Sequence, residues 1–161
     1  MKLPFFATVL LSSSLWAQGV RADTAMLKGL PKALGVTVEP LDPDARKAGL
    51  NEAALQKVVL SRFAKHHISF TQQPSAEVYS RVVVLTSTDV QGKVLGYGAH
   101  IELSCREKAL LKRDPATEFM APIWFKGNVT VSNPQQFTSD VVRALADLTD
   151  QFLNDYQHEN H

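Results

Sequence analysis

The sequence predicts an α+β fold: a mixed sheet of about four strands with two helices packed on one face. Three stretches lead to this prediction. Residues 78–105 alternate between apolar and polar side chains, as two strands of a half-buried sheet do. Residues 51–65 and 137–156 instead place apolar residues every three or four positions, which is typical of amphipathic helices. The order strand, helix, hairpin, strand, helix is that of an α+β domain.

Residues 1–22 have the pattern of a secretory signal peptide. Lys2 precedes an apolar run over residues 5–16, and small residues end the segment at Ala22. The run is shorter than the roughly 20 residues that a transmembrane helix needs. We therefore expect cleavage near Ala22, one α+β domain over residues 23–156, and a periplasmic or secreted location without stable membrane insertion.

The charge balance excludes one class of partner. The chain has 17 basic and 16 acidic residues, and removal of Lys2 and Arg21 with the signal peptide changes this balance little. A nucleic-acid-binding domain normally shows a basic patch or stripe. We therefore expect no nucleic-acid partner.

The first half of the domain is expected to supply one strand and one helix. An arm over residues 23–34 leads into a strand at residues 35–39. Asn51 is a good N-cap for the following helix, and residues 68–70 form a short extended segment after it. The apolar stripe of the helix consists of Leu55, Val58, Val59 and Phe63.

The hairpin has a predictable register, because the length of the connecting loop fixes the pairing. Either a two-residue or a four-residue loop within residues 89–93 pairs Val82 with Ile101 and Arg81 with Glu102. Apolar side chains then meet on one face and opposite charges meet on the other. We expect the Val82 face to lie under the helices.

The second strand of the hairpin contains the one cysteine and two glycines. Cys105 shares the apolar face with Ile101 and Leu103, so we expect a buried thiol rather than a reactive one. Gly96 and Gly98 lie inside the strand, where glycine marks a bulge or a close approach of another group.

The last part of the chain is expected to form a connection, a strand and a long helix. Residues 107–122 read as an irregular connection, with one helical turn over residues 109–112. Residues 123–132 form a strand with Trp124 and Lys126 on the face opposite Ile123, Phe125, Val129 and Val131. Residues 157–161 form a flexible polar tail. The helix before it has the stripe Phe137, Val141, Leu145, Leu148, Phe152 and Tyr156.

No catalytic or cofactor motif occurs in the sequence. No serine lies in a Gly-x-Ser-x-Gly turn, and the five histidines do not follow a known metal-ligand spacing. We therefore predict no catalytic residues and no cofactor, with enzymatic activity third among the functions considered. If a metal binds, His66 and His100 are the alternative ligands.

The order of the elements resembles that of the amino-terminal domain of TolB and of similar small domains in envelope lipoproteins. The resemblance is carried by the strand at residues 36–38, the helix at 55–63, the hairpin, and the helix at 137–156. It implies a module that docks onto another envelope protein and performs no chemistry. The lipid-attachment cysteine of such lipoproteins is missing here.

The sheet face turned away from the helices is the candidate binding surface. Its mixture of aromatic, arginine and aliphatic residues is typical of protein interfaces. The alternative is that the arm 23–34 or the connection 107–122 covers this face. The candidate partner-binding residues are Tyr79, Arg81, His100, Glu102, Trp124 and Lys126, beside Val83 and Leu85.

The favoured function is therefore that of a soluble, non-enzymatic periplasmic module for protein interaction or assembly in the cell envelope. Its expected partner is another envelope protein or a second copy of the chain. The alternative function is a periplasmic protein that binds a metal or a small molecule.

Overall fold

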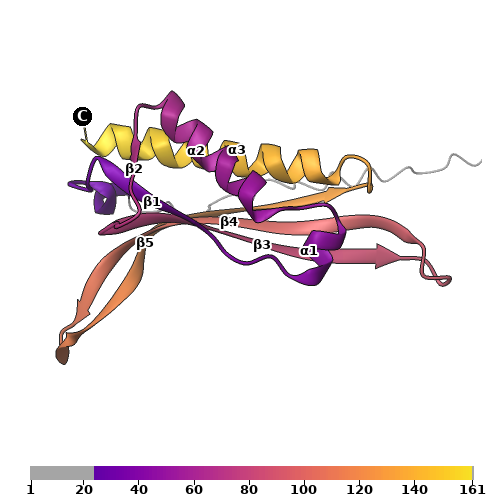
Figure 1. Cartoon of the computed structure of the whole chain (residues 1–161), viewed down its shortest axis with the longest axis horizontal. Coiled ribbons are helices and arrows are strands. Elements are labelled where there is room, and N and C mark those ends of the chain that lie inside the picture. The colour runs from indigo at the N-terminus through magenta and orange to yellow at the C-terminus, as the bar shows by residue number, and fades with distance from the viewer. Residues whose placement is uncertain (1–23, 161) are drawn as a thin grey trace, which may run out of the picture.

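A five-stranded mixed sheet forms one layer of the molecule, and the two long helices form the other (Figure 1). The computed structural model describes residues 24–160, so the expected signal peptide lies outside the described residues. The strand order is β2-β1-β3-β4-β5, parallel between β2, β1 and β3 and antiparallel from β3 to β5. The strands are β1 (Ala33–Val38), β2 (Ser69–Phe70), β3 (Ala76–Thr88), β4 (Val94–Leu111) and β5 (Asp114–Ser132).

Two longer helices and two short ones complete the described chain. They are the 3-10 helix η1 (Thr24–Leu27) and the α-helices α1 (Pro43–Lys47), α2 (Glu52–Lys65) and α3 (Phe137–Asn160). The α+β prediction is confirmed. The sheet has one strand more than expected, because the short extended segment pairs with β1 as β2.

Helix α2 begins where the sequence predicted. The side chain of Asn51 accepts a hydrogen bond from the backbone N–H of Ala54 at 3.1 Å, which satisfies one of the free donors in the first turn. Leu55, Val59 and Phe63 are buried on one side of the helix, whereas Val58 is only partly buried. The stripe is therefore narrower than expected.

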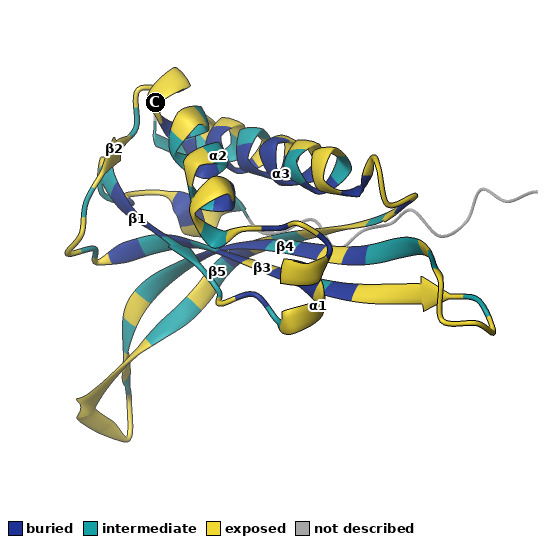
Figure 2. Ribbon diagram, turned by 45° about the vertical axis from the view of Figure 1, so that its right-hand side comes forward, coloured by how far each residue is buried: buried dark blue, intermediate teal, exposed yellow. Residues whose placement is uncertain are grey.

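Helix α3 provides the main apolar surface above the sheet. All six residues of its predicted stripe are buried, and the helix contacts α2, η1, β4 and β5. Buried residues are concentrated between this helix and the sheet (Figure 2). The long stripe therefore joins the sheet, the second helix and the N-terminal segment in one core.

The end of α3 differs from the expected polar tail, because the helix continues through Gln157 to Asn160. Gln157 Nε2 donates a hydrogen bond to the carbonyl of His66, and Asn160 Nδ2 donates one to the carbonyl of Leu27. These amides satisfy backbone acceptors at the ends of α2 and η1, which holds residues 157–160 in the fold.

The hairpin register is confirmed. Val82 pairs with Ile101 and Arg81 with Glu102. The predicted loop length is wrong: Thr88 pairs with Val94, so the loop has the five residues 89–93, and a register shift between Ser87 and Thr88 restores the predicted pairing. The expected ion pair between Arg81 and Glu102 is not formed. The guanidinium of Arg81 instead lies 3.4 Å from the carboxylate of Glu39, in the loop after β1.

The expected connection over residues 107–122 is wrong. These residues extend β4 and β5 into a two-stranded ribbon that projects from the body of the sheet (Figure 1). Glu107 pairs with Ala121 and Leu110 with Glu118. The strand β5 begins at Asp114–Pro115, and because β5 is an edge strand it can accommodate this proline.

The first prediction tests the position of α3. Leu145 is fully buried in the middle of the stripe. Leu145→Ala should lower the free energy of unfolding by about 2–5 kcal/mol, through lost transfer energy and the cavity left behind. Asp147→Ala, on the exposed side of the same helix, is the matched control and should change it by less than about 0.5 kcal/mol. Chemical denaturation measures both, and equal effects would contradict this packing.

Candidate protein interface

The described residues leave one face of the sheet open. The arm packs on the helix side, where Leu27 and Leu30 are buried and the Tyr156 hydroxyl donates to the carbonyl of Pro31 at 3.0 Å. The segment 107–122 continues the sheet as the ribbon and does not fold back. Neither of the two segments that could have covered this face, residues 24–34 and 107–122, therefore lies on it. We call this face of the sheet, opposite the helices, the outer face.

The outer face consists of four cross-strand rows on β3, β4 and β5. By register, they are Tyr79–Ser104–Phe125, Arg81–Glu102–Gly127, Val83–His100–Val129 and Leu85–Gly98–Val131.

Four large apolar side chains in these rows are strongly exposed. Leu85 is 73 % exposed, Phe125 60 %, Val129 68 % and Val131 81 %. Soluble monomers rarely gather exposed apolar side chains into one patch without a binding function. The outer face is therefore the strongest candidate interface in the described chain.

Four of the six predicted interface residues lie on the outer face, and two do not. Tyr79, Arg81, His100 and Glu102 lie there, as the register predicted. Trp124 and Lys126 point to the helix side, opposite Cys105 and Leu103 respectively. The sequence pattern therefore divides residues 123–132 correctly between two faces, but the prediction of which face lies outside is wrong. Phe125, Val129 and Val131 are on the outer face.

Contacts with α3 explain the correction. Trp124 is 1 % exposed, its ring packs edge-on against Phe152 at a centroid distance of 5.2 Å, and its Nε1–H donates to Asp155 at 3.0 Å. Lys126 Nζ lies 3.1 Å from the same carboxylate. Asp155, next to Tyr156 of the stripe, was the sequence signal that could have identified the inner side of β5.

Charged groups near β1 are paired within the chain. The Glu39 carboxylate accepts a hydrogen bond from the Tyr79 hydroxyl at 2.6 Å and forms the ion pair with Arg81. The Arg106 guanidinium lies over the Tyr79 ring, 3.4 Å from its centroid. Burial and the hydrogen bond to Glu39 raise the pKa of Tyr79, so its hydroxyl remains a donor.

A second carboxylate next to β1 is also paired. Glu77 accepts a hydrogen bond from the Thr37 hydroxyl at 2.7 Å.

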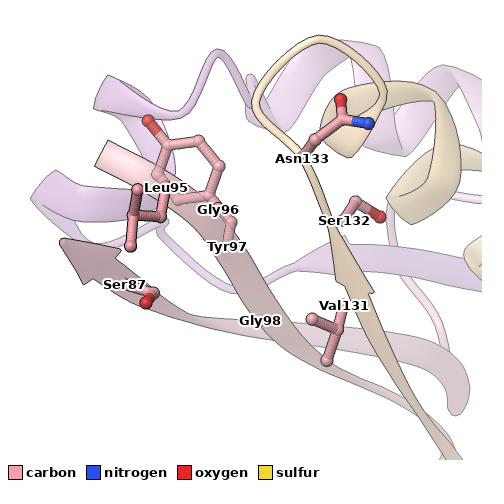
Figure 3. Close-up of a pocket in the computed structure, with 8 residues that line it drawn as sticks. All are labelled: Ser87, Leu95, Gly96, Tyr97, Gly98, Val131, Ser132 and Asn133. Carbon is pink, nitrogen blue, oxygen red and sulfur yellow. The ribbon is translucent and has the colours of Figure 1, made fainter. Parts of the chain in front are cut away.

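The two glycines expected to mark a bulge or a close approach line a hollow between the ends of β4 and β5 (Figure 3). Gly98 and Val131 in its wall belong to the outer face, whereas Tyr97 packs on Phe137 on the helix side. A Cβ at Gly96 would lie 2.9 Å from the carbonyl oxygen of Ser132, so a close approach requires glycine there. A Cβ at Gly98 would meet only the Thr130 carbonyl oxygen, at 4.0 Å. The hollow, of about 400 Å³, is lined by Ser87, Leu95, Gly96, Tyr97, Gly98, Val131, Ser132 and Asn133.

The structure does not bring the two alternative metal ligands together. His66 ends α2 on the helix side, with Nδ1 3.1 Å from Gln157 Oε1 and Nε2 3.5 Å from Asp150 Oδ1. His100 lies on the outer face. Within residues 24–160, no three His, Cys, Asp or Glu side chains are grouped so that they could hold a metal ion.

A second hollow, of about 420 Å³, lies beside His66 on the helix side. It is lined by Leu30, Lys32, His66, His67, Ile68, Ser69, Tyr156, Gln157 and Asn160. Its polar groups include the His66 and Gln157 side chains, which already contact each other.

Cys105 is buried as predicted. Burial, with smaller contributions from Glu107 and Glu77, raises the pKa of its thiol to about 12. The thiol therefore stays protonated at neutral pH and acts as a small apolar side chain.

A helix that crosses a bilayer must be both long and strongly apolar. No helix within residues 24–160 combines these two properties.

Comparison of the sequence with protein-family descriptions and with curated proteins gives no match. Solved structures give similar folds. A PelC variant dodecamer from Paraburkholderia phytofirmans is 11 % identical, with a TM-score of 0.46 over 77 % of this chain and 89 % of that one. A minor lipoprotein from Acinetobacter baumannii is 10 % identical, with a TM-score of 0.44 over 80 % and 93 %. The rare lipoprotein B from Shewanella oneidensis is 13 % identical, with a TM-score of 0.39 over 78 % and 94 %.

Two of these three proteins are named as lipoproteins, and none is named as a TolB domain. The identities of 10–13 % and the TM-scores of 0.39–0.46 are too low to carry a function over to this chain.

The second prediction tests the corrected strand phase with two neighbouring residues. Trp124→Ala should lower the free energy of unfolding by about 3–5 kcal/mol, because it removes a buried ring. Phe125→Ala should change it by less than about 0.5 kcal/mol, because its ring is exposed. Denaturation in dilute protein, where association does not contribute, measures both. A larger loss for Phe125→Ala would reverse the assignment.

The third prediction concerns Cys105. Because its thiol is buried and has a pKa of about 12, a thiol reagent at pH 8 should modify the native protein only through unfolding. Addition of denaturant should expose the thiol and make the reaction fast. Rapid labelling of the native protein would contradict the burial of Cys105.

Proposed function

We propose that this chain is a non-enzymatic protein-interaction module of the bacterial cell envelope, and that the outer face is its docking surface. The observation that carries the proposal is the group of four exposed apolar side chains on that face, Leu85, Phe125, Val129 and Val131. Burying such a side chain is worth about 1.5–3 kcal/mol relative to leaving it exposed. Four of them supply enough to offset part of the cost of association.

The polar groups beside the apolar rows favour a protein partner. Glu39 pairs with Arg81, and the Arg106 guanidinium is held over Tyr79. These groups form a polar rim that is already ordered before binding, and an apolar centre with a polar rim is the usual construction of a protein interface. An ordered rim also lowers the entropy lost on binding.

The signal-peptide pattern of residues 1–22 supports the proposed envelope location. The outer face needs no cofactor or nucleophile for docking. The proposed module therefore acts by binding another protein, and its scaffold presents the β3–β5 surface while α2 and α3 stabilise the opposite face.

The fourth prediction compares two adjacent positions of β5 that point to opposite faces. Val129→Lys places a charge on the outer face, next to His100 of the neighbouring strand, and should abolish association with a protein partner. Asn128→Lys, also at an exposed position but on the helix side, is the control and should leave association unchanged. The measurements are capture of proteins from an envelope extract, sedimentation velocity and thermal unfolding. Equal association by both variants, with the fold intact, would argue against this docking surface.

A further inference from the structure

We infer that the outer face binds a second copy of this chain, in one two-fold symmetric register. This inference rests on the proposed docking function and specifies its partner. The two-fold axis lies between the two sheets and runs across the strands. It passes midway between the row that contains Glu102 and the row that contains His100. Such a two-fold interface is isologous, so each contact between two different residues occurs twice.

The row order makes this register self-complementary. Rows on one face of a strand lie about 6.7 Å apart, because they are two residues apart along it. The axis therefore places the Phe125 row over the Val131 row of the second copy, and the Glu102 row over its His100 row. Two sheets related in this way can pack about 10 Å apart, with their strands nearly aligned.

The outermost rows supply a projection and a cavity that fit each other. Phe125 has an aromatic side chain that is 60 % exposed, and its register partner on β4 is the small Ser104. At the other end, the row contains Gly98, which borders the hollow of about 400 Å³. In the proposed register, Phe125 of each copy enters the hollow of the other. Aromatic side chains in such desolvated pockets supply most of the energy in many interfaces.

The inner rows supply matching polar groups. Within residues 24–160, the side chains of Glu102 and His100 make no hydrogen bond or ion pair with each other or with a neighbour, unlike Arg81 and Tyr79. The two-fold axis brings Glu102 of each copy to His100 of the other. A carboxylate and an imidazole can form a hydrogen bond there, so the centre of the interface leaves neither group unpaired.

A second copy fits these features better than an unrelated partner does. The same face contains both the projecting ring and the hollow, at equal distances from one axis, and both members of the central polar pair. The twelve positions of the four rows are fewer than the roughly 20–30 residues per side of a standard interface. We therefore expect a weak dimer, with a Kd in the micromolar range.

The test uses one variant that removes the Phe125 ring, one that fills the hollow at Gly98, and the double variant that does both. Phe125→Ala should raise the dimer Kd about tenfold or more, as loss of an interface anchor does. Gly98→Leu should do the same by filling the hollow, and the backbone at Gly98 has room for a Cβ. The double variant should bind more tightly than either single variant, because the introduced leucine side chain then occupies the space left by Phe125. Asn128→Lys on the helix side is the matched control, and thermal unfolding checks each fold.

Sedimentation velocity from about 1 to 500 µM covers the expected Kd range. Cross-linking provides a second measurement: a short bifunctional thiol reagent should join Phe125→Cys and Gly98→Cys chains in a mixture, because residues on sheets about 10 Å apart are too far apart for a direct disulfide. The same reagent should not join Phe125→Cys chains alone. A wild-type chain that stays monomeric at about 500 µM, or single variants with unchanged Kd, would overturn the inference. If Val129→Lys still abolishes capture of another envelope protein in that case, the docking function stands and only the second-copy partner is wrong.

Discussion

Packing of α3 on the inner face of β4 and β5 is the contact on which the rest of the structure depends. The helix buries its stripe against Ile101, Leu103 and Trp124, and it also contacts α2 and η1. Because these elements all lie on the same side, the described chain has no further segment to cover the outer face. The unpartnered apolar rows therefore result directly from where the longest helix packs.

The ends of the chain reinforce this arrangement. Gln157 and Asn160 connect the last turn of α3 to the end of α2 and to η1 through backbone carbonyls. The Tyr156 hydroxyl adds a bond to Pro31. These contacts keep the N-terminal arm on the helix side, so the same hydrogen bonds that stabilise the core also leave the outer face accessible.

The sequence was sufficient to predict the elements with strong periodicity. The stripe of α3, the Asn51 cap and the hairpin register all depend on local spacing, and all three are confirmed. The β4–β5 ribbon was missed because its two strands are stabilised mainly by pairing with each other. Local patterns of charged and apolar residues do not reveal such pairing, and residues 107–122 were interpreted as an irregular connection with one helical turn.

The phase of β5 could not be read from apolarity, since both faces of residues 123–132 contain large apolar side chains. Asp155 decides which face of β5 turns toward the helices. Its carboxylate accepts a hydrogen bond from the Trp124 indole and forms an ion pair with Lys126. This tertiary contact draws Trp124 inward, and the strand alternation then forces Phe125, Val129 and Val131 outward. One hydrogen-bonded pair thus decides the composition of the candidate interface. Where both faces of a strand contain apolar residues, the binding surface can be assigned only after the contacts of the inner face with the helices are known.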